Sequence, residues 1–121
     1  MTLRVTRDDL RVLLDLWASA GIDADGVCGW VAGYWPEGGA RFPDEEAGGL
    51  SVAREVVAEL DLLPVHLITV EDVPALLRAL DARPGEGARA VEELRRYREA
   101  IDRRARSRAL RRIPLYRPFC L

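Results

Sequence analysis

The chain has 121 residues, of which 49% are hydrophobic and 31% charged, as is typical of one soluble domain that buries its core without disulfides or metals. All 18 basic residues are arginines, so there is no lysine for a Schiff base or a P-loop. One histidine, His66, and two cysteines, Cys28 and Cys120, cannot supply the four Cys/His ligands of a structural zinc. We therefore expect no metal and no cofactor, and we assign no catalytic residue.

Charge is divided unevenly along the chain. Residues 1–86 hold 7 arginines and 16 acidic residues, a net charge of −9, whereas residues 87–121 hold 11 arginines and 4 acidic residues, a net charge of +7. This asymmetry predicts an acidic α+β body over 1–86 and a basic C-terminal helix and tail over 87–121, packed as one domain. Because the N-terminus mixes arginines with aspartates and no apolar run approaches a membrane span of roughly 20 residues, we expect a cytoplasmic protein with no membrane partner.

The first predicted helix covers residues 7–20. Thr6 and Asp9 have the spacing of a capping box, leucines recur every three or four positions, and Gly21 follows as a C-cap glycine. Ahead of this helix, residues 3–5 are apolar and β-branched enough to predict a short strand.

The next segment, residues 27–35, is predicted to be a strand. It would place Trp30 and Tyr34 on one face and Trp35 on the other, so that one set of rings is exposed beside the glycine-rich loop at 36–43. Exposed aromatic side chains of this kind are plausible anchors for a partner. Helical spacing fits Cys28, Val31 and Trp35 too, but the glycines in and just before the run, Gly26, Gly29 and Gly33, would each cost about 1 kcal/mol inside a helix.

Three further elements are expected in the middle of the chain. Residues 51–61 have the pattern of a helix with Ser51 as its N-cap. Residues 65–70 have the length and β-branched content of a buried strand. Another helix begins at Asp72 and ends before a turn at residues 82–87.

The last predicted helix is the longest and covers residues 88–112. Its apolar stripe is surrounded by charge, and three acid–arginine pairs at i,i+4 spacing are expected on it: Glu92 with Arg96, Glu99 with Arg103, and Asp102 with Arg106. After residue 102 there are seven more arginines and no acidic residue. The basic character of the chain is therefore concentrated at the end of this helix.

Cys28 and His66 are the strongest candidates for enzyme chemistry. They would form a thiolate and its base if the two predicted strands were neighbours. A lone histidine in an apolar strand and a cysteine between small residues are more often packed side chains. A small enzyme using Cys28 or His66 is therefore the third of the three functional hypotheses.

These elements together predict a small α+β domain. A short sheet containing residues 27–35 and 65–70 would be covered by the first three helices, with the C-terminal helix packed along its apolar stripe. A mostly helical bundle is the alternative.

The favoured function is a non-enzymatic protein-interaction module, such as an accessory, immunity or antitoxin-like subunit. Its partner would be a protein with an acidic surface or a second copy of the chain, and nucleic-acid binding by the arginine-rich helix is the alternative. The candidate partner-binding residues are Arg103, Arg104, Arg108, Arg111, Arg112, Trp30, Tyr34 and Trp35.

Overall fold

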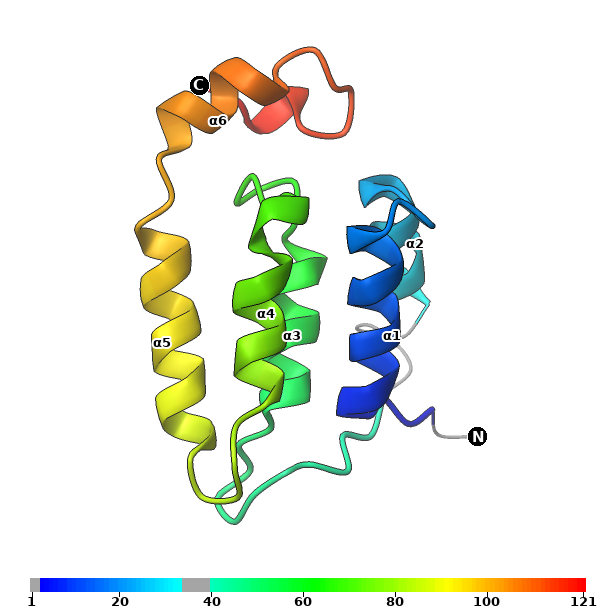
Figure 1. Ribbon diagram of the computed structural model, residues 1–121, viewed down its shortest axis with the longest axis vertical. Coiled ribbons are helices and arrows are strands. Elements are labelled where there is room, and N and C mark those ends of the chain that lie inside the picture. The colour runs from blue at the N-terminus through cyan, green and yellow to red at the C-terminus, as the bar shows by residue number, and fades with distance from the viewer. Residues whose placement is uncertain (1–2, 34–39) are drawn as a thin grey trace.

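The computed structural model describes residues 3–33 and 40–121, which form a helical bundle (Figure 1). The α-helices are α1 (Arg7–Ala18), α2 (Ala24–Ala32), α3 (Val52–Asp61), α4 (Val73–Leu80), α5 (Gly87–Glu99) and α6 (Arg103–Leu110), with the 3-10 helices η1 (Val70–Asp72) and η2 (Arg117–Phe119). These residues contain no sheet. The predicted α+β fold is therefore wrong, and the helical-bundle alternative is the observed architecture.

One apolar core joins α1 to α5. The predicted capping box at the start of α1 is confirmed, since Thr6 Oγ1 accepts from the backbone N–H of Asp9, and the Asp9 carboxylate accepts from the backbone N–H of Thr6. The buried residues of α1 are Leu10, Leu13, Leu14 and Trp17. The predicted helix at 51–61 is also confirmed, with Ser51 as the N-cap of α3.

The predicted strand at residues 27–35 is instead largely the helix α2. Asp23 caps it by accepting from the N–H of Gly26 at 2.8 Å, and Val27 and Val31, one turn apart, are both buried against the core. Burial of this valine stripe, together with the cap, offsets the helix-weakening glycines, so tertiary packing overrides local propensity here. Tyr34 and Trp35 lie outside the described residues.

The predicted strand at residues 65–70 is a series of turns that leads into η1. Backbone hydrogen bonds close them, from His66 N–H to the Leu62 carbonyl and from Ile68 N–H to the Leu63 carbonyl. The partner strand expected at 27–35 is helical, so this apolar run has no ladder to join. The other predicted strand, at 3–5, contributes only an isolated parallel bridge from Arg4 to Arg41.

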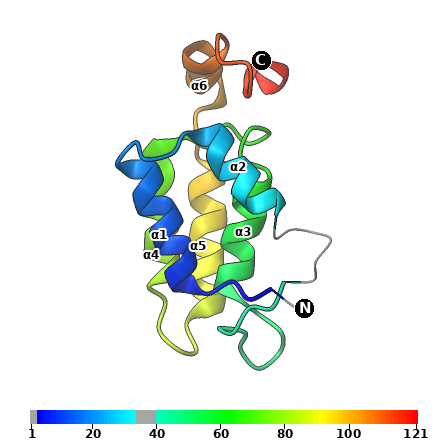
Figure 2. The same ribbon diagram turned by 90° about the vertical axis from the view of Figure 1, so that its right-hand side faces the viewer.

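The predicted helix at 88–112 is divided into α5 and α6. Ala100 ends α5, and Asp102 starts α6 by accepting from the N–H of Ala105 at 3.0 Å. Figures 1 and 2 show that α6 lies across the end of the bundle. A straight helix would carry residues 103–112 past that end, whereas the break lets Leu110 and Tyr116 join the core.

The break also changes the ion pairs on these helices. Of the three predicted pairs, Glu92–Arg96 is present at 3.1 Å, whereas Glu99–Arg103 and Asp102–Arg106 are not found in the described part of the chain. Glu99 pairs with Arg95 within α5, and Arg106 turns toward the bundle. Because α5 ends before α6 begins, residues four apart across the break no longer lie on the same face of one helix.

Candidate functional site

The inward face of α6 is attached to the bundle by an ion pair between the half-buried Arg106 and the buried Asp72. Arg106 Nη1 lies 2.5 Å from Asp72 Oδ2, and Arg106 Nη2 lies 2.8 Å from Asp72 Oδ1. Asp72 is 1% exposed and also accepts from the Tyr97 hydroxyl at 2.6 Å. We refer to Asp72, Tyr97 and Arg106 as the Asp72 network, which joins η1, α5 and α6.

Hydrogen bonds keep the Asp72 network ionised. Burial alone would raise the pKa of Asp72, but donors from Arg106, Tyr97 and the backbone of Thr69 hold it below its usual value. The pKa of Tyr97 is raised by its own burial and by donating to this carboxylate. The network is therefore a fixed anion and a fixed cation at neutral pH.

The C-terminal segment, residues 103–121, also satisfies the carbonyls of the turns that replace the predicted second strand. The donors are Arg103 to the Val65 carbonyl at 3.1 Å, Arg106 to the Leu67 carbonyl at 2.9 Å, and the Tyr116 hydroxyl to the Ile68 carbonyl at 2.6 Å. Side chains from the segment thus supply the hydrogen-bond donors that the backbone of a neighbouring strand would have supplied. This arrangement fixes the orientation of α6 about its axis.

The outward face of α6 carries arginines of a different kind. Arg104, Arg108, Arg111 and Arg112 are all exposed, and their spacing of three or four residues places them on one side of the helix and its last turn. Within the described part of the chain, no acidic side chain pairs with them. We call these four residues the arginine face.

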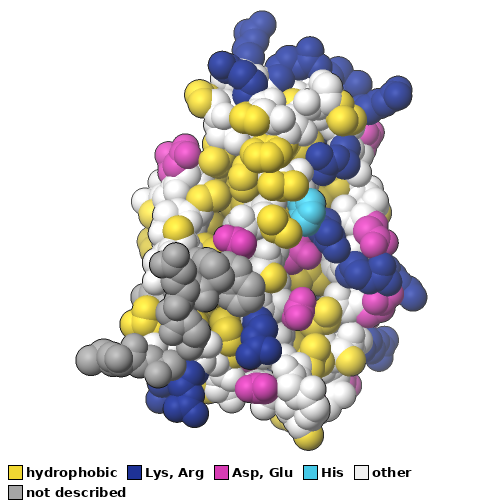
Figure 3. All heavy atoms as spheres, turned by 180° about the vertical axis from the view of Figure 1, so that it is seen from behind, with side chains coloured by type: hydrophobic (Ala, Val, Ile, Leu, Met, Phe, Trp, Pro, Cys, Tyr) yellow, Lys and Arg dark blue, Asp and Glu magenta, His cyan; other side chains and the backbone are white. Residues whose placement is uncertain are grey.

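The end of the chain folds beside the arginine face. The Arg117 guanidinium donates to the carbonyls of Arg111 and Arg112 at 3.3 and 3.4 Å, which holds the turn that follows α6. Ile113 and Phe119 are 41% and 38% exposed in this turn and in η2. Figure 3 shows arginines gathered at this end of the molecule, with hydrophobic side chains next to them.

The structure separates the residues that the sequence groups as partner-binding. The arginine face is four of the five predicted arginines, whereas Arg103 lies on the inward side of α6 against Val65. Trp30 is half-buried and packs against the core. The sequence predicts Asp72 only as a helix cap, because an aspartate before a helix pattern is typical of an N-cap, whereas its partners Tyr97 and Arg106 lie 25 and 34 positions away.

Cys28 and His66 lie in different electrostatic surroundings. Burial and the charges of Asp25 and Asp61 raise the pKa of the Cys28 thiol, which opposes a thiolate. His66 Nδ1 is 4.0 Å from Glu59 and is without a hydrogen-bond partner in the described structure. The Cys28 thiol therefore lacks the electropositive surroundings that activate a nucleophile.

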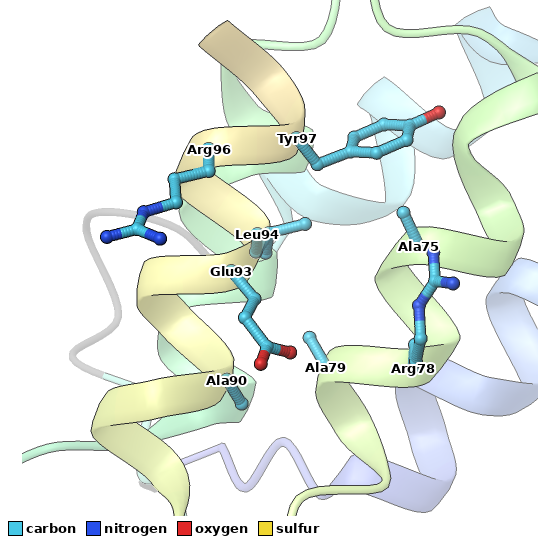
Figure 4. A pocket seen from close by; sticks show the side chains of 8 residues that line it. All are labelled: Ala75, Arg78, Ala79, Ala90, Glu93, Leu94, Arg96 and Tyr97. Carbon is cyan, nitrogen blue, oxygen red and sulfur yellow. The ribbon is translucent and has the colours of Figure 1, made fainter. Parts of the chain in front are cut away.

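A groove of about 410 Å³ lies between α4 and α5 (Figure 4). Ala75, Ala79 and Ala90 face it, and Glu93 projects between the two helices from α5. Over the described residues, no three potential metal ligands gather in this groove or elsewhere. The groove is a gap between two neighbouring helices, which the short alanine side chains do not fill.

No family model matches the chain, and neither a curated protein nor a solved structure matches it. Among the described helices, none combines the length and the apolar character needed to cross a membrane. The arginine face is the surface whose chemistry is most distinct, because its charges are not used by the fold.

Proposed function

We propose that the protein is a non-enzymatic interaction module that binds an acidic protein surface through the arginine face. One observation carries this proposal. On the inward side of α6, Arg103 and Arg106 are bound by carbonyls and by Asp72, while the four outward arginines have no acidic partner in the described structure. Guanidinium groups bind carboxylates through paired, planar hydrogen bonds, so this surface suits clustered Asp and Glu side chains.

The neighbouring apolar groups favour a protein over a nucleic acid. Ile113 and Phe119 are exposed beside the arginines, and a mixture of arginine, aromatic and aliphatic side chains is characteristic of protein interfaces. The net charge of −9 on residues 1–86 repels a polyphosphate chain that extends beyond the arginine face. An acidic patch on a protein can be small enough to contact only the arginine face, so it avoids repulsion by the acidic residues of 1–86.

The arginine face is presented on a rigid support. The Asp72 network and the three carbonyl contacts hold α6 in one orientation. The helix therefore does not have to rotate for the arginine face to meet a partner. Such preorganisation lowers the entropic cost of association.

The test is a matched pair of fourfold variants. One changes Arg104, Arg108, Arg111 and Arg112 to Ser, and the control changes Arg78, Arg83, Arg89 and Arg96, which are also exposed, to Ser. Both lose four positive charges. Cross-linking and mass spectrometry in a nuclease-treated native lysate should join acidic segments of a partner to α6 in the wild type and the control, and not in the α6 variant.

Two further measurements decide between the alternatives. Fluorescence anisotropy with labelled RNA and DNA at physiological salt should show no sub-micromolar binding; tight binding that weakens steeply with salt would instead assign the face to nucleic acid. Sedimentation of the purified protein should show a monomer. A concentration-dependent dimer that the α6 variant abolishes and the control keeps would identify the partner as a second copy.

A further inference from the structure

Helices α1 and α3 begin at the end of the bundle opposite α6 (Figure 1). A second group of arginines belongs to the residues that precede or start these two helices. Arg4, Arg41 and Arg54 line one hollow of about 530 Å³, together with Phe42 and Glu45 and two small apolar residues. Counted over the described lining residues, three guanidinium groups and one carboxylate leave an excess of positive charge in this hollow. It is separate from the arginine face in position and in sequence.

Backbone pairing places two of these arginines side by side. Arg4 and Arg41 are partners in the isolated parallel bridge, held by the N–H of Val5 to the Arg41 carbonyl at 2.9 Å and by the N–H of Arg41 to the Leu3 carbonyl at 2.7 Å. Paired residues of adjacent strands project to the same side, and like charges there are destabilising. In the described structure neither arginine forms an ion pair that would relieve this repulsion.

The third arginine is fixed over an aromatic ring. The Arg54 guanidinium carbon lies 5.2 Å from the centre of the Phe42 ring, and Phe42 is 5% exposed and part of the core. Arg54 also donates to the Gly49 carbonyl at 3.4 Å. The cation–π contact holds this guanidinium beside the hollow without neutralising its charge.

The geometry points to a binding site for a phosphate group, either free phosphate or the phosphate of a small ester. A dianion would offset the repulsion between Arg4 and Arg41, and guanidinium groups match phosphate oxygens through paired hydrogen bonds. Among the described residues, Glu45 is the one acidic residue that lines the hollow, and it disfavours a ligand of high negative charge that fills the whole space. The hollow exceeds the size of phosphate itself, so it has room for an uncharged organic group beside Phe42.

The experiment is a calorimetric titration of the full chain with inorganic phosphate and with phenyl phosphate, at ionic strength matched by sodium chloride. Arg4→Gln, Arg41→Gln and Arg54→Gln should each raise the dissociation constant at least tenfold, while the control Arg83→Gln, an exposed arginine elsewhere, should change it less than twofold. Tighter binding of phenyl phosphate than of inorganic phosphate would identify an ester as the ligand. Equal binding would identify free phosphate.

A melting experiment guards against variants that bind weakly because they fold poorly. Without phosphate, Arg4→Gln should melt at the wild-type temperature or above it, because it removes a like-charge contact. With phosphate, the wild type should gain melting temperature and Arg4→Gln should not. Binding of citrate in preference to both phosphates, no binding of either phosphate, or an equal loss in Arg83→Gln would overturn the proposal.

Discussion

The five-helix bundle and the C-terminal segment are held in place by different forces. In α1 to α5 the buried side chains are almost all aliphatic, with Leu10, Leu14 and Leu60 wholly inaccessible. In the segment, α6 buries only Ser107 and Leu110. Leu110 and Tyr116 join the core, and hydrogen bonds from Arg103, Arg106 and Tyr116 add polar contacts with the bundle.

This difference has a consequence for the arginine face. Apolar packing is non-directional, whereas hydrogen bonds and bidentate ion pairs fix orientation. An α6 docked by leucines alone could rotate about its axis at modest cost, but Arg106 reaches both Asp72 and the Leu67 carbonyl in one orientation only. The polar attachment thus determines which arginines face solvent.

The largest expected effect comes from Asp72→Asn. The amide would place a donor against the Arg106 guanidinium and leave this half-buried cation without its anion. Since breaking a fully buried pair costs about 3–5 kcal/mol, we expect a loss of unfolding free energy of up to that size. Hydrogen exchange should accelerate in α6 and η2 more than in α1 or α3. The control is Asp81→Asn, since Asp81 is exposed and its ion pair with Arg11 is worth little. Uniform acceleration across all helices would contradict the distinction between bundle and segment.

A leucine in the bundle should behave differently. Leu60→Ala removes a wholly buried side chain from α3 and leaves a cavity, at a cost of about 2–5 kcal/mol. Urea denaturation measures the loss, and hydrogen exchange should accelerate in every helix, because the core is shared. Acceleration confined to α3 would show that the bundle is not one cooperative unit.

The parts of the fold that sequence predicts are those with local signals. The capping box at Thr6 and the cap at Ser51 lie next to amphipathic stripes, and both helices occur where predicted. The sequence predicts a strand at 27–35 because the run is apolar and aromatic and its glycines disfavour a helix, and a strand at 65–70 because of its β-branched content. Their real structure depends on packing against α3 and on donors from Arg103, Arg106 and Tyr116, which no local pattern reveals.

The candidate site divides in the same way. The run of arginines after Asp102 is evident in the sequence, but their separation into inward and outward faces depends on where α5 ends. Asp102 is the one local signal for that break, since aspartate is a favoured N-cap residue. The spacing of Asp102 to Arg106 also fits an i,i+4 ion pair within one long helix. The sequence therefore predicts that pair in place of the N-cap that Asp102 forms.

His66 lies where the bundle meets the segment and gives a test by pH. Its pKa is lowered by burial and by Arg98 and Arg103, so the folded state binds a proton less readily than the unfolded state. The contribution to stability is complete above the unfolded pKa of about 6.5 and decreases as the pH falls from there toward the lower folded pKa. Urea denaturation at pH 7.5, 6.5 and 5.5 should show this decrease.

The control for His66 is His66→Gln, which stays neutral. Glu59 faces His66 from α3 and has a pKa raised by burial, so its protonation opposes the histidine effect over the lower part of this range. The difference between the wild type and His66→Gln therefore isolates the histidine. A wild type that gains stability relative to His66→Gln on acidification would show that Glu59 or another acid stabilises the charged imidazole.

The smallest expected effect comes from relieving a strained backbone conformation at Ala20. Among the described residues that carry a side chain, two have a positive φ, and both belong to the bundle. Ala20, after α1, has φ 63° and Leu67, beneath the segment, has φ 56°. This left-handed region costs a residue with a side chain about 1 kcal/mol relative to glycine. Ala20 is exposed, so Ala20→Gly should raise the free energy of unfolding by up to about 1 kcal/mol in urea denaturation.

Leu67→Gly relieves the same strain and should nevertheless destabilise the protein. Its side chain is wholly buried, and losing that contact costs about 2–5 kcal/mol, more than the strain returns. The carbonyl that accepts from Arg106 would also belong to a more mobile residue, so exchange in α6 should accelerate. If Leu67→Gly instead stabilised the protein as Ala20→Gly is expected to, the turn beneath the segment would be held by its hydrogen bonds alone, and the apolar core would end at α3 and α4.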